Sequence, residues 1–344
     1  MRYHLAALLL LGCCLFPTAS LRGQDQLEKI TQVVDSLGSG GKMEVDRDSK
    51  RILLLQMQGK KVTNETLAVL KGFPGLLHVQ LRSAKIDGKG LANLADSKGI
   101  YFLALSQSSI HDDDLAAISG LVDMQELRLD KTAITDKGLI HLKPMNKIDT
   151  LHLANTKVTD VGLEHLAHMK NMYKLDLSRT QITNEGLVHL KEMKKLDELQ
   201  LSNTRVTDAG LEHLAGLTGL RSLLLSYMKL DGTGLKHLTN ARNLEILYLN
   251  NCQITDEGLQ QLAQFPKLRT IYLQQNKVTD AGMKHLSKVK NLETLWINDN
   301  NVTDAGLAEL EKCKKMEDLS LSGTKVTEAG IAQFKKAVPK CRAR

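Results

Sequence analysis

Residues 196–219 read LDELQLSNTRVTDAGLEHLAGLTG, and this stretch recurs with variations along most of the chain. Val206 within it has an aliphatic counterpart every 24 residues, without one insertion or deletion. A fixed period of about 20–29 residues, with a strand-like and a helix-like half, is typical of a solenoid of stacked repeats. The twelve equivalent positions are Val62, Ile86, Ile110, Ile134, Val158, Ile182, Val206, Leu230, Ile254, Val278, Val302 and Val326.

Alternation within the repeat separates its core from its surface. Leu199 and Leu201 flank Gln200, and successive side chains of a strand face opposite sides. The two leucines are therefore expected in the core, and Gln200 on the open face of a parallel sheet. The other expected core residues are Leu196 and Val206, followed by the apolar stripe of a short helix at Leu211, Leu214 and Leu217.

Polar and small residues mark where each repeat turns. Thr207 or Asp208 is predicted to cap its own helix through a side-chain oxygen. Gly210, whose position is Gly in ten of the twelve repeats, permits close helix-to-strand packing or an unusual backbone angle. Asn203 and Thr204 follow the strand, where side chains can bond backbone groups that adjacent coils leave free.

These residues resemble the leucine-rich-repeat family, in its short bacterial 24-residue form. The resemblance covers about residues 52–338. It implies an α/β solenoid of about 12 repeats, a right-handed βα superhelix curved into an arc with a parallel concave β-sheet and short convex helices. It also implies a concave face that binds proteins. Residues 251–264 (NCQITDEGLQQLAQ) are similar to repeats of F-box substrate receptors too, but no segment resembles an F-box, so a ubiquitin-ligase role is not carried over.

The first 20 residues are predicted to be a secretory signal peptide. A short basic start precedes an apolar run, residues 5–16, that is too short to span a membrane, and small residues follow. The alternative is a lipoprotein signal, because Leu10-Leu11-Gly12-Cys13 resembles a lipobox and Cys13 would then carry the lipid. Either signal predicts an exported protein: periplasmic, in the cell envelope or secreted.

Both ends of the solenoid are expected to carry caps, since terminal repeats would otherwise expose their apolar faces. Residues 21–51 form the predicted N-terminal cap, a helix over residues 24–37 and a short strand at Met43-Glu44-Val45. The solenoid is expected over residues 52–338, and residues 339–344 after it as a short C-terminal tail.

Composition narrows the possible functions. Hydrophobic residues make up 42% of the chain but aromatics only 3%, so the core must consist mainly of aliphatic residues. The formal net charge of +7 is spread over the repeats, which is typical of a solvated surface and leaves docking to anionic envelope polymers open. Nucleic acid is not expected as a partner, because no nucleic-acid-binding module is recognisable.

The variable column on the open face is where function is expected, because the fold does not dictate its residues. Three consecutive members are aromatic, Tyr248, Tyr272 and the single Trp296. With strands about 4.8 Å apart, these rings should form one ladder. The whole column is Gln56, Gln80, Ala104, Arg128, His152, Asp176, Gln200, Leu224, Tyr248, Tyr272, Trp296 and Ser320.

Polar neighbours complete the candidate site. Tyr and Trp beside amides are typical of binding surfaces, since they combine apolar area with a polar group. Three hypotheses follow: a protein or peptide ligand, a carbohydrate stacked on the rings, or a structural envelope protein whose rings only stabilise adjacent strands. The flanking candidates are Tyr227, Asn250, Asn251, Gln274, Gln275, Asn298 and Asp299.

Catalysis and metal binding are not expected. His152 beside Asp176 suggests a hydrolase, but Ser178 shares the strand of Asp176 and Ala154 occupies the position next to His152. Six histidines share one helix position, yet neighbouring helices about 8–10 Å apart cannot converge on one ion. No cofactor is predicted. A disulfide between Cys313 and Cys341 remains open. The six histidines are His141, His165, His189, His213, His237 and His285.

Overall fold

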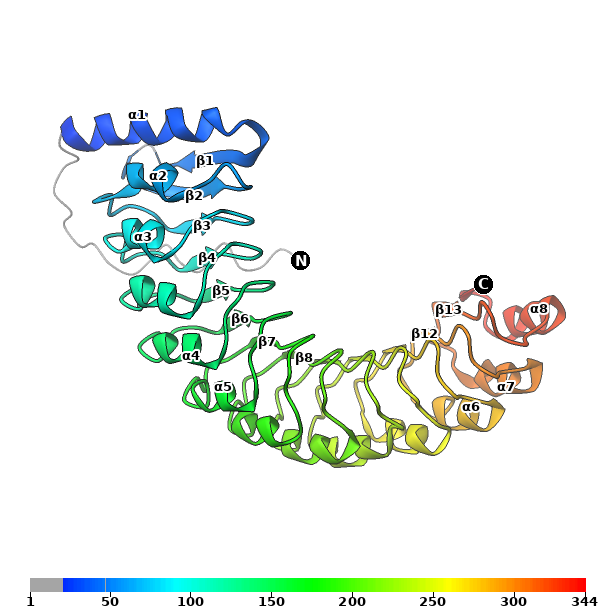
Figure 1. Ribbon diagram of the computed structural model, residues 1–344. Helices are drawn as coiled ribbons and strands as arrows, with labels where there is room; N and C mark the ends of the chain where they lie inside the picture. The colour runs from blue at the N-terminus through cyan, green and yellow to red at the C-terminus, as the bar shows by residue number, and fades with distance from the viewer. Residues whose placement is uncertain (1–20, 47) are drawn as a thin grey trace.

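The computed structural model describes residues 21–46 and 48–344. They form one 14-stranded sheet in which every strand pairs with the next along the chain. Figure 1 shows an arc with strands on its inner side and helices on its outer side. The strands are β1 (Gly41–Val45), β2 (Ile52–Met57), β3 (His78–Gln80), β4 (Phe102–Ala104), β5 (Glu126–Arg128), β6 (Thr150–His152), β7 (Lys174–Asp176), β8 (Glu198–Gln200), β9 (Ser222–Leu224), β10 (Ile246–Tyr248), β11 (Thr270–Tyr272), β12 (Thr294–Trp296), β13 (Asp318–Ser320) and β14 (Arg342–Ala343).

The register confirms the predicted solenoid. From β2 to β14 all pairings are parallel, as in β10 and β11, where Tyr248 lies opposite Tyr272. Each pair is offset by one repeat, so equivalent residues form straight columns across the sheet.

Short helices cover the outer side, and many are 3₁₀ rather than α. This suits the three-residue spacing of the buried leucines, because a 3₁₀ helix has about three residues per turn. The α-helices are α1 (Leu21–Ser36), α2 (Asn64–Leu67), α3 (Gly88–Leu91), α4 (Asp136–Leu139), α5 (Asp160–Glu164), α6 (Asp280–Leu286), α7 (Asp304–Glu309) and α8 (Glu328–Ala337). The 3₁₀ helices are η1 (Gly38–Gly40), η2 (Ala68–Leu70), η3 (Ala92–Leu94), η4 (Asp112–Ile118), η5 (Ile140–Leu142), η6 (Glu185–Leu190), η7 (Asp208–Leu214), η8 (Thr233–Leu238), η9 (Glu257–Gln264) and η10 (Leu310–Lys312).

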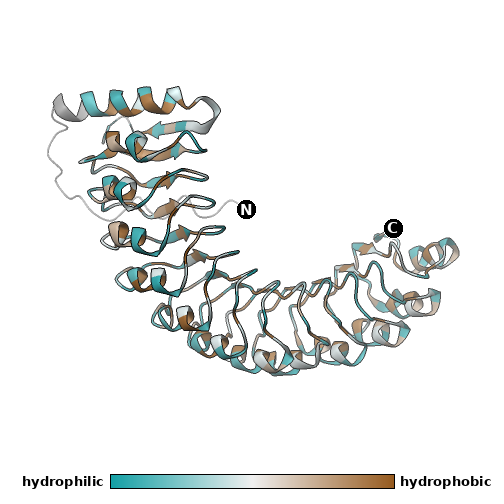
Figure 2. Cartoon of the chain, viewed as in Figure 1, coloured by the Kyte–Doolittle hydropathy of each residue, from teal (hydrophilic) through white to brown (hydrophobic). Residues whose placement is uncertain are grey.

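One aliphatic core runs the length of the arc between strands and helices. Leu199 of β8, Leu201 and Val206 after it, and Leu211 and Leu214 of η7 are all buried, as predicted. Figure 2 shows the matching alternation of hydrophobic and hydrophilic residues along the coils. The core therefore grows by one layer per repeat, and no aromatic side chain is needed at these positions.

The predicted helix caps are partly wrong, because the carboxylate at the helix start serves the following repeat. Asp280 accepts hydrogen bonds from the backbone N–H of Thr303 (2.8 Å) and from its hydroxyl (2.7 Å), across one repeat boundary. Asp208 likewise accepts from Asp231 and Gly232 of the next repeat rather than capping its own helix. Equivalent bonds are made by Asn64, Asp112, Asp136, Asp160, Asn184, Asp256 and Asp304. We call this set the inter-repeat carboxylates, with Asn64 and Asn184 as its amide members.

Charge stabilises one member of this set. Hydrogen bonds from the backbone N–H and the hydroxyl of Thr327 outweigh desolvation and hold the pKa of Asp304 below its ordinary value. The ionised form is thus the one the fold prefers. Each inter-repeat carboxylate satisfies donors at the start of the next helix, which would otherwise lack partners.

Glycine recurs at this helix position for a reason other than close helix-to-strand packing or an unusual backbone angle. A Cβ atom on Gly210 would collide with the amide of Asn184 in the preceding repeat, and one on Gly282 with the carboxylate of Asp256. Neither glycine has a positive φ. Glycine at this position therefore makes room for the inter-repeat carboxylate of the preceding repeat.

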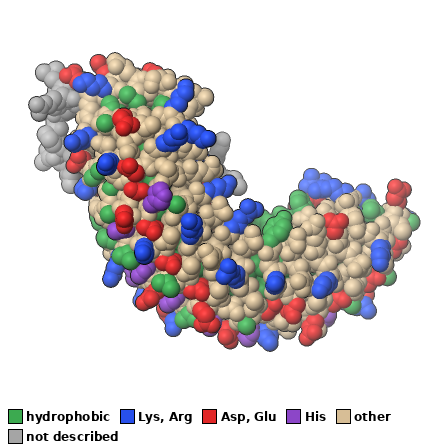
Figure 3. All heavy atoms as spheres, in the orientation of Figure 1, with side chains coloured by type: hydrophobic (Ala, Val, Ile, Leu, Met, Phe, Trp, Pro, Cys, Tyr) green, Lys and Arg blue, Asp and Glu red, His purple; other side chains and the backbone are tan. Residues whose placement is uncertain are grey.

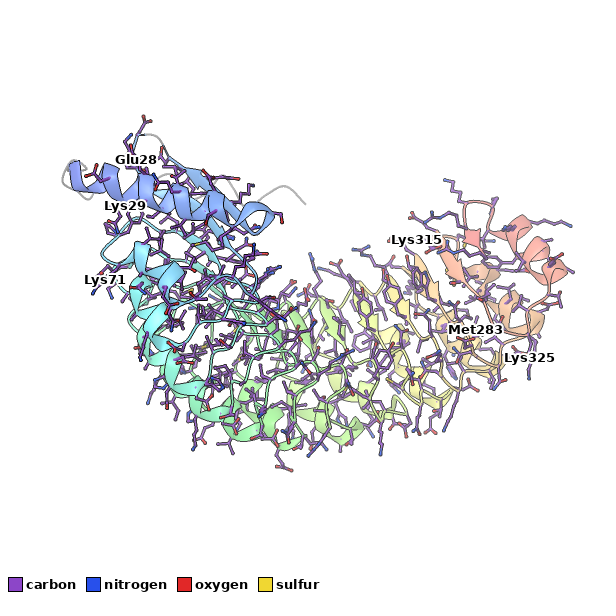
Figure 4. All side chains as sticks on the ribbon, turned by 45° about the horizontal axis from the view of Figure 1, so that its top comes forward. Glu28, Lys29, Lys71, Met283, Lys315 and Lys325 are labelled. Carbon is purple, nitrogen blue, oxygen red and sulfur yellow. The ribbon has the colours of Figure 1, made fainter. Side chains whose placement is uncertain are left out.

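The N-terminal helix and strand are present where the sequence predicted them. α1 places Ile30 and Val34 in the core, while Glu28 and Lys29, labelled in Figure 4, are exposed. β1 pairs antiparallel with β2. This hairpin and helix cover the apolar end of the first repeat. The predicted signal peptide, with Cys13, lies outside the described residues.

Residues 339–344, predicted as a short terminal cap or tail, include a strand that caps the sheet. Arg342 and Ala343 form β14, which extends the sheet beside β13, and Cys341 and Ala343 are buried. Cys313 and Cys341 are free thiols rather than a disulfide, and burial raises the pKa of each to about 11. Buried thiols held in the neutral form are poor nucleophiles.

Candidate functional site

The three aromatic residues predicted on the open face do meet there. The Tyr248 and Tyr272 rings stack with centroids 4.3 Å apart and planes 17° apart. Trp296 continues the column, but its ring is turned 88° to Tyr272 at 5.1 Å, so the ladder ends edge-to-face rather than as a uniform stack. Figure 3 shows hydrophobic side chains gathered on the inner side of the arc, toward its C-terminal half. We call Tyr248, Tyr272 and Trp296 the aromatic column.

Burial affects the chemistry of this column. All three side chains are half-buried on the sheet. Burial raises the pKa of Tyr248, and the adjacent Tyr272 adds to the effect. Tyr248 therefore presents a neutral phenol group, and the facing sides of the two tyrosine rings are covered by each other.

The first row of predicted amides lies beside the column, two residues after each strand ends. Asn250, Gln274 and Asn298 are half-buried. The Asn250 amide oxygen accepts from the backbone N–H of Gln274 (3.0 Å), which fixes that side chain. The buried Oδ1 atom of Asn298 has no hydrogen-bond partner within the described residues. The Asn250 side chain therefore stabilises the fold, whereas Oδ1 of Asn298 accepts no hydrogen bond from the described residues.

The second predicted row lies further out, in the turn after each strand. Tyr227, Asn251, Gln275 and Asp299 are exposed and have φ between 50° and 61°, in the left-handed region. Asn251 donates to the amide oxygen of Gln275 (3.0 Å). No ring contact among the described residues joins Tyr227 to the aromatic column. This row forms a rim, which the sequence had not separated from the column itself.

Two residues next to Trp296 were missed. Asp318 accepts from the Trp296 indole N–H (2.9 Å) and, through its other oxygen, from Arg344 (2.9 Å). The Arg344 guanidinium also lies over the Trp296 ring, 5.9 Å from its centroid. Asp318 begins the strand beside β12, so the register could have placed it here. Arg344 could not have been placed here from the sequence, because β14, the strand that it follows, was not predicted.

On strands β5 to β7 the open face carries charged side chains. His152 lies between two carboxylates, 3.9 Å from Glu126 and 3.8 Å from Asp176. Burial opposes ionisation of Asp176, but hydrogen bonds from His152 and Ser178 outweigh it and lower its pKa. Ser178 contacts Asp176 through its backbone N–H (2.9 Å). These side chains form a charged row on the sheet, and Ser178 is hydrogen-bonded to the Asp176 carboxylate.

Among the described residues, neither the histidines nor the cysteines cluster into a site. The six aligned histidines are half-buried on the helical side, one per repeat. Within residues 21–46 and 48–344, no group of three or more His, Cys, Asp or Glu could hold a metal ion. The same residues include no helix that is long and apolar enough to cross a membrane.

Sequence comparison supports the repeat assignment. Residues 242–287, which include β10 and β11, match the family described as Leucine Rich repeats (2 copies). Residues 168–190 and 290–310 match the family described as Leucine Rich repeat. The chain contains leucine-rich repeats. No curated protein sequence matches it significantly.

Solved leucine-rich-repeat structures share the fold. An internalin from Listeria monocytogenes is 19% identical, with a TM-score of 0.67 and coverage of 93% of this chain and 94% of that one. A leucine-rich-repeat protein from Leptospira interrogans is 15% identical, with a TM-score of 0.52 and coverage of 96% and 100%. The ectodomain of a plant receptor kinase from Arabidopsis thaliana, solved in complex with a Casparian strip integrity factor, is 14% identical, with a TM-score of 0.55 and coverage of 92% and 43%. At these identities the similarity establishes the fold alone.

Proposed function

We propose that this leucine-rich-repeat protein is a non-enzymatic scaffold that binds a protein or peptide through the aromatic column. The observation that carries the proposal is the contact of Tyr248, Tyr272 and Trp296 on the open face. Tyrosine and tryptophan dominate binding energies because they bury much apolar area with little loss of side-chain freedom. The amide and Tyr227 rim would set the orientation of the ligand.

The surroundings of the column favour an uncharged segment of the ligand. In β9 to β12, the strand residues beside the column are Ser222, Ile246, Thr270 and Thr294, none of which is charged. The amides on the other side are also neutral. Arg344, the basic side chain over Trp296, is already paired with Asp318. An aromatic or aliphatic side chain of a peptide can bury its area against the rings.

Carbohydrate is the weaker alternative because of ring orientation. A sugar stacks on an exposed aromatic face, but Tyr248 and Tyr272 already stack on each other, and the Trp296 ring lies beneath Arg344. We further propose that binding takes place outside the cytoplasm, in line with the predicted signal peptide or with a lipid anchor at Cys13.

Selection from a random dodecapeptide library tests this function. Peptides bound by the wild type are expected to carry aromatic or aliphatic side chains. Tyr248→Ala combined with Trp296→Ala should weaken their binding at least about tenfold, the loss expected from removing central aromatic anchors. Binding is measured by titration calorimetry with Trp-free selected peptides.

A matched control separates the column from aromatic residues in general. Tyr173→Ala removes a tyrosine that is 48% exposed outside the column, and it should leave the affinity unchanged. If the double variant binds the selected peptides as tightly as the wild type does, the aromatic column is not the binding site. Strong binding on a glycan array that is lost in Trp296→Ala would favour the carbohydrate alternative instead.

A further inference from the structure

We propose that Asp318 and Arg344 are positioning residues that clamp Trp296 in its binding orientation before any ligand arrives. The proposal rests on the proposed function, because it explains how the aromatic column is prepared for a ligand. It also predicts how that ligand is recognised. The indole N–H is used inside the protein, so the ligand engages the apolar area of Trp296 and not its hydrogen-bond donor.

The first argument is the position of Asp318. The residue is 9% exposed, and its two carboxylate oxygens are each used, Oδ2 by the Trp296 indole N–H and Oδ1 by Arg344. A buried carboxylate is costly unless it is paired and hydrogen-bonded. Both partners are therefore needed to keep Asp318 beside the ring, and the hydrogen bond to the charged acceptor is stronger than a neutral one.

The second argument is the way Arg344 is held. Its backbone carbonyl accepts from the N–H of Leu321 (2.7 Å), and its own N–H donates to the carbonyl of Leu319 (3.1 Å). Both backbone groups of Arg344 are therefore hydrogen-bonded, one to β13 and one to the residue that follows β13. The guanidinium reaches from this fixed point to Asp318 and over the Trp296 ring. The Arg344 side chain is 55% exposed, so its ion pair alone would contribute little. Its role is to keep the Asp318 oxygen directed at the indole.

The third argument is the contrast with the rest of the column. Tyr248 and Tyr272 hold each other by stacking, whereas Trp296 is turned edge-on and has no stacked partner on β13, where Ser320 occupies the column. Without the clamp, only packing would fix this ring. A side chain that must be ordered on binding lowers affinity, and a preformed one avoids that loss.

The single tryptophan makes the test direct. Time-resolved fluorescence anisotropy of ligand-free protein reports on Trp296 alone. The wild type should show only slow, whole-molecule depolarisation. Asp318→Ala should add a fast local component and weaken binding of a Trp-free selected peptide about two- to tenfold, the factor expected when one more side chain is ordered on binding.

Two further variants keep the test valid if Asp318→Ala folds poorly. Asp318→Asn retains an oxygen that can accept the indole N–H and should behave closer to the wild type. Arg344→Gln changes a half-exposed side chain and should give a smaller fast component than Asp318→Ala. Thermal melting followed by circular dichroism checks that each variant is folded.

The outcomes separate the clamp from the proposed function. A wild-type anisotropy decay in both Asp318→Ala and Arg344→Gln would overturn the clamp. A fast component without any loss of peptide affinity would overturn the positioning role. Failure of every peptide to bind the wild type would refute the proposed function, and the ligand-free anisotropy would still support or overturn the clamp by itself.

Discussion

Asp280→Ala is expected to lower the free energy of unfolding by about 1–3 kcal/mol, the range for leaving a polar group without its partner. The change removes the acceptor of two hydrogen bonds from Thr303, one from its backbone and one from its hydroxyl. These bonds cross a repeat boundary, and a solenoid is stabilised largely by such nearest-neighbour interfaces. Urea unfolding followed by circular dichroism measures the loss.

The chain itself supplies the control for this change. At the equivalent place, Asn184 accepts from the Thr207 backbone N–H (2.9 Å) and donates to its hydroxyl (2.9 Å). Asp280→Asn should therefore keep both contacts and cost less than about 1 kcal/mol. If the Ala and Asn variants lose equal stability, the hydrogen bonds are not what Asp280 contributes.

Gly234→Ala is expected to destabilise the protein by about 1–3 kcal/mol, although alanine normally favours a helix over glycine. The new Cβ would lie 2.8 Å from both the carbonyl carbon and the Cα of Asp208. These are backbone atoms of the preceding repeat, so the clash cannot be relieved by rotating a side chain. Thermal and urea unfolding of the variant measure the effect.

Gly120→Ala is the matched control for this clash. The nearest atom to a Cβ at Gly120 is the Lys98 amino nitrogen at 3.1 Å, at the end of a flexible side chain. Its stability should be unchanged or slightly higher, because alanine restricts the unfolded chain. Equal losses at Gly120 and Gly234 would show that contact between repeats is not the cause.

The fold could be predicted from the sequence because its signal is repeated twelve times. The alternation around Gln200 and the spacing of Leu211 and Leu214 recur without insertions, so errors in one repeat are corrected by the others. The function of Asp208 and Gly210 was misjudged for a physical reason. Their contacts lie across repeat boundaries, and a pattern read within one repeat cannot show them.

The candidate site was predicted only in outline. The parallel register brings Tyr248, Tyr272 and Trp296 together because their spacing equals the repeat. Ring orientation does not follow from spacing, so the turn of Trp296 was not foreseen. It depends on Asp318 and on Arg344, which follows β14, a two-residue strand outside the repeat pattern.

The fluorescence of Trp296 during peptide titration tests the central claim most directly, because it is the only tryptophan in the sequence. Binding of a Trp-free selected peptide should shift the emission to shorter wavelength and reduce quenching by acrylamide, since the ring loses contact with water. A peptide that binds by calorimetry yet leaves both the emission and the quenching of Trp296 unchanged would contradict the aromatic column as the binding site.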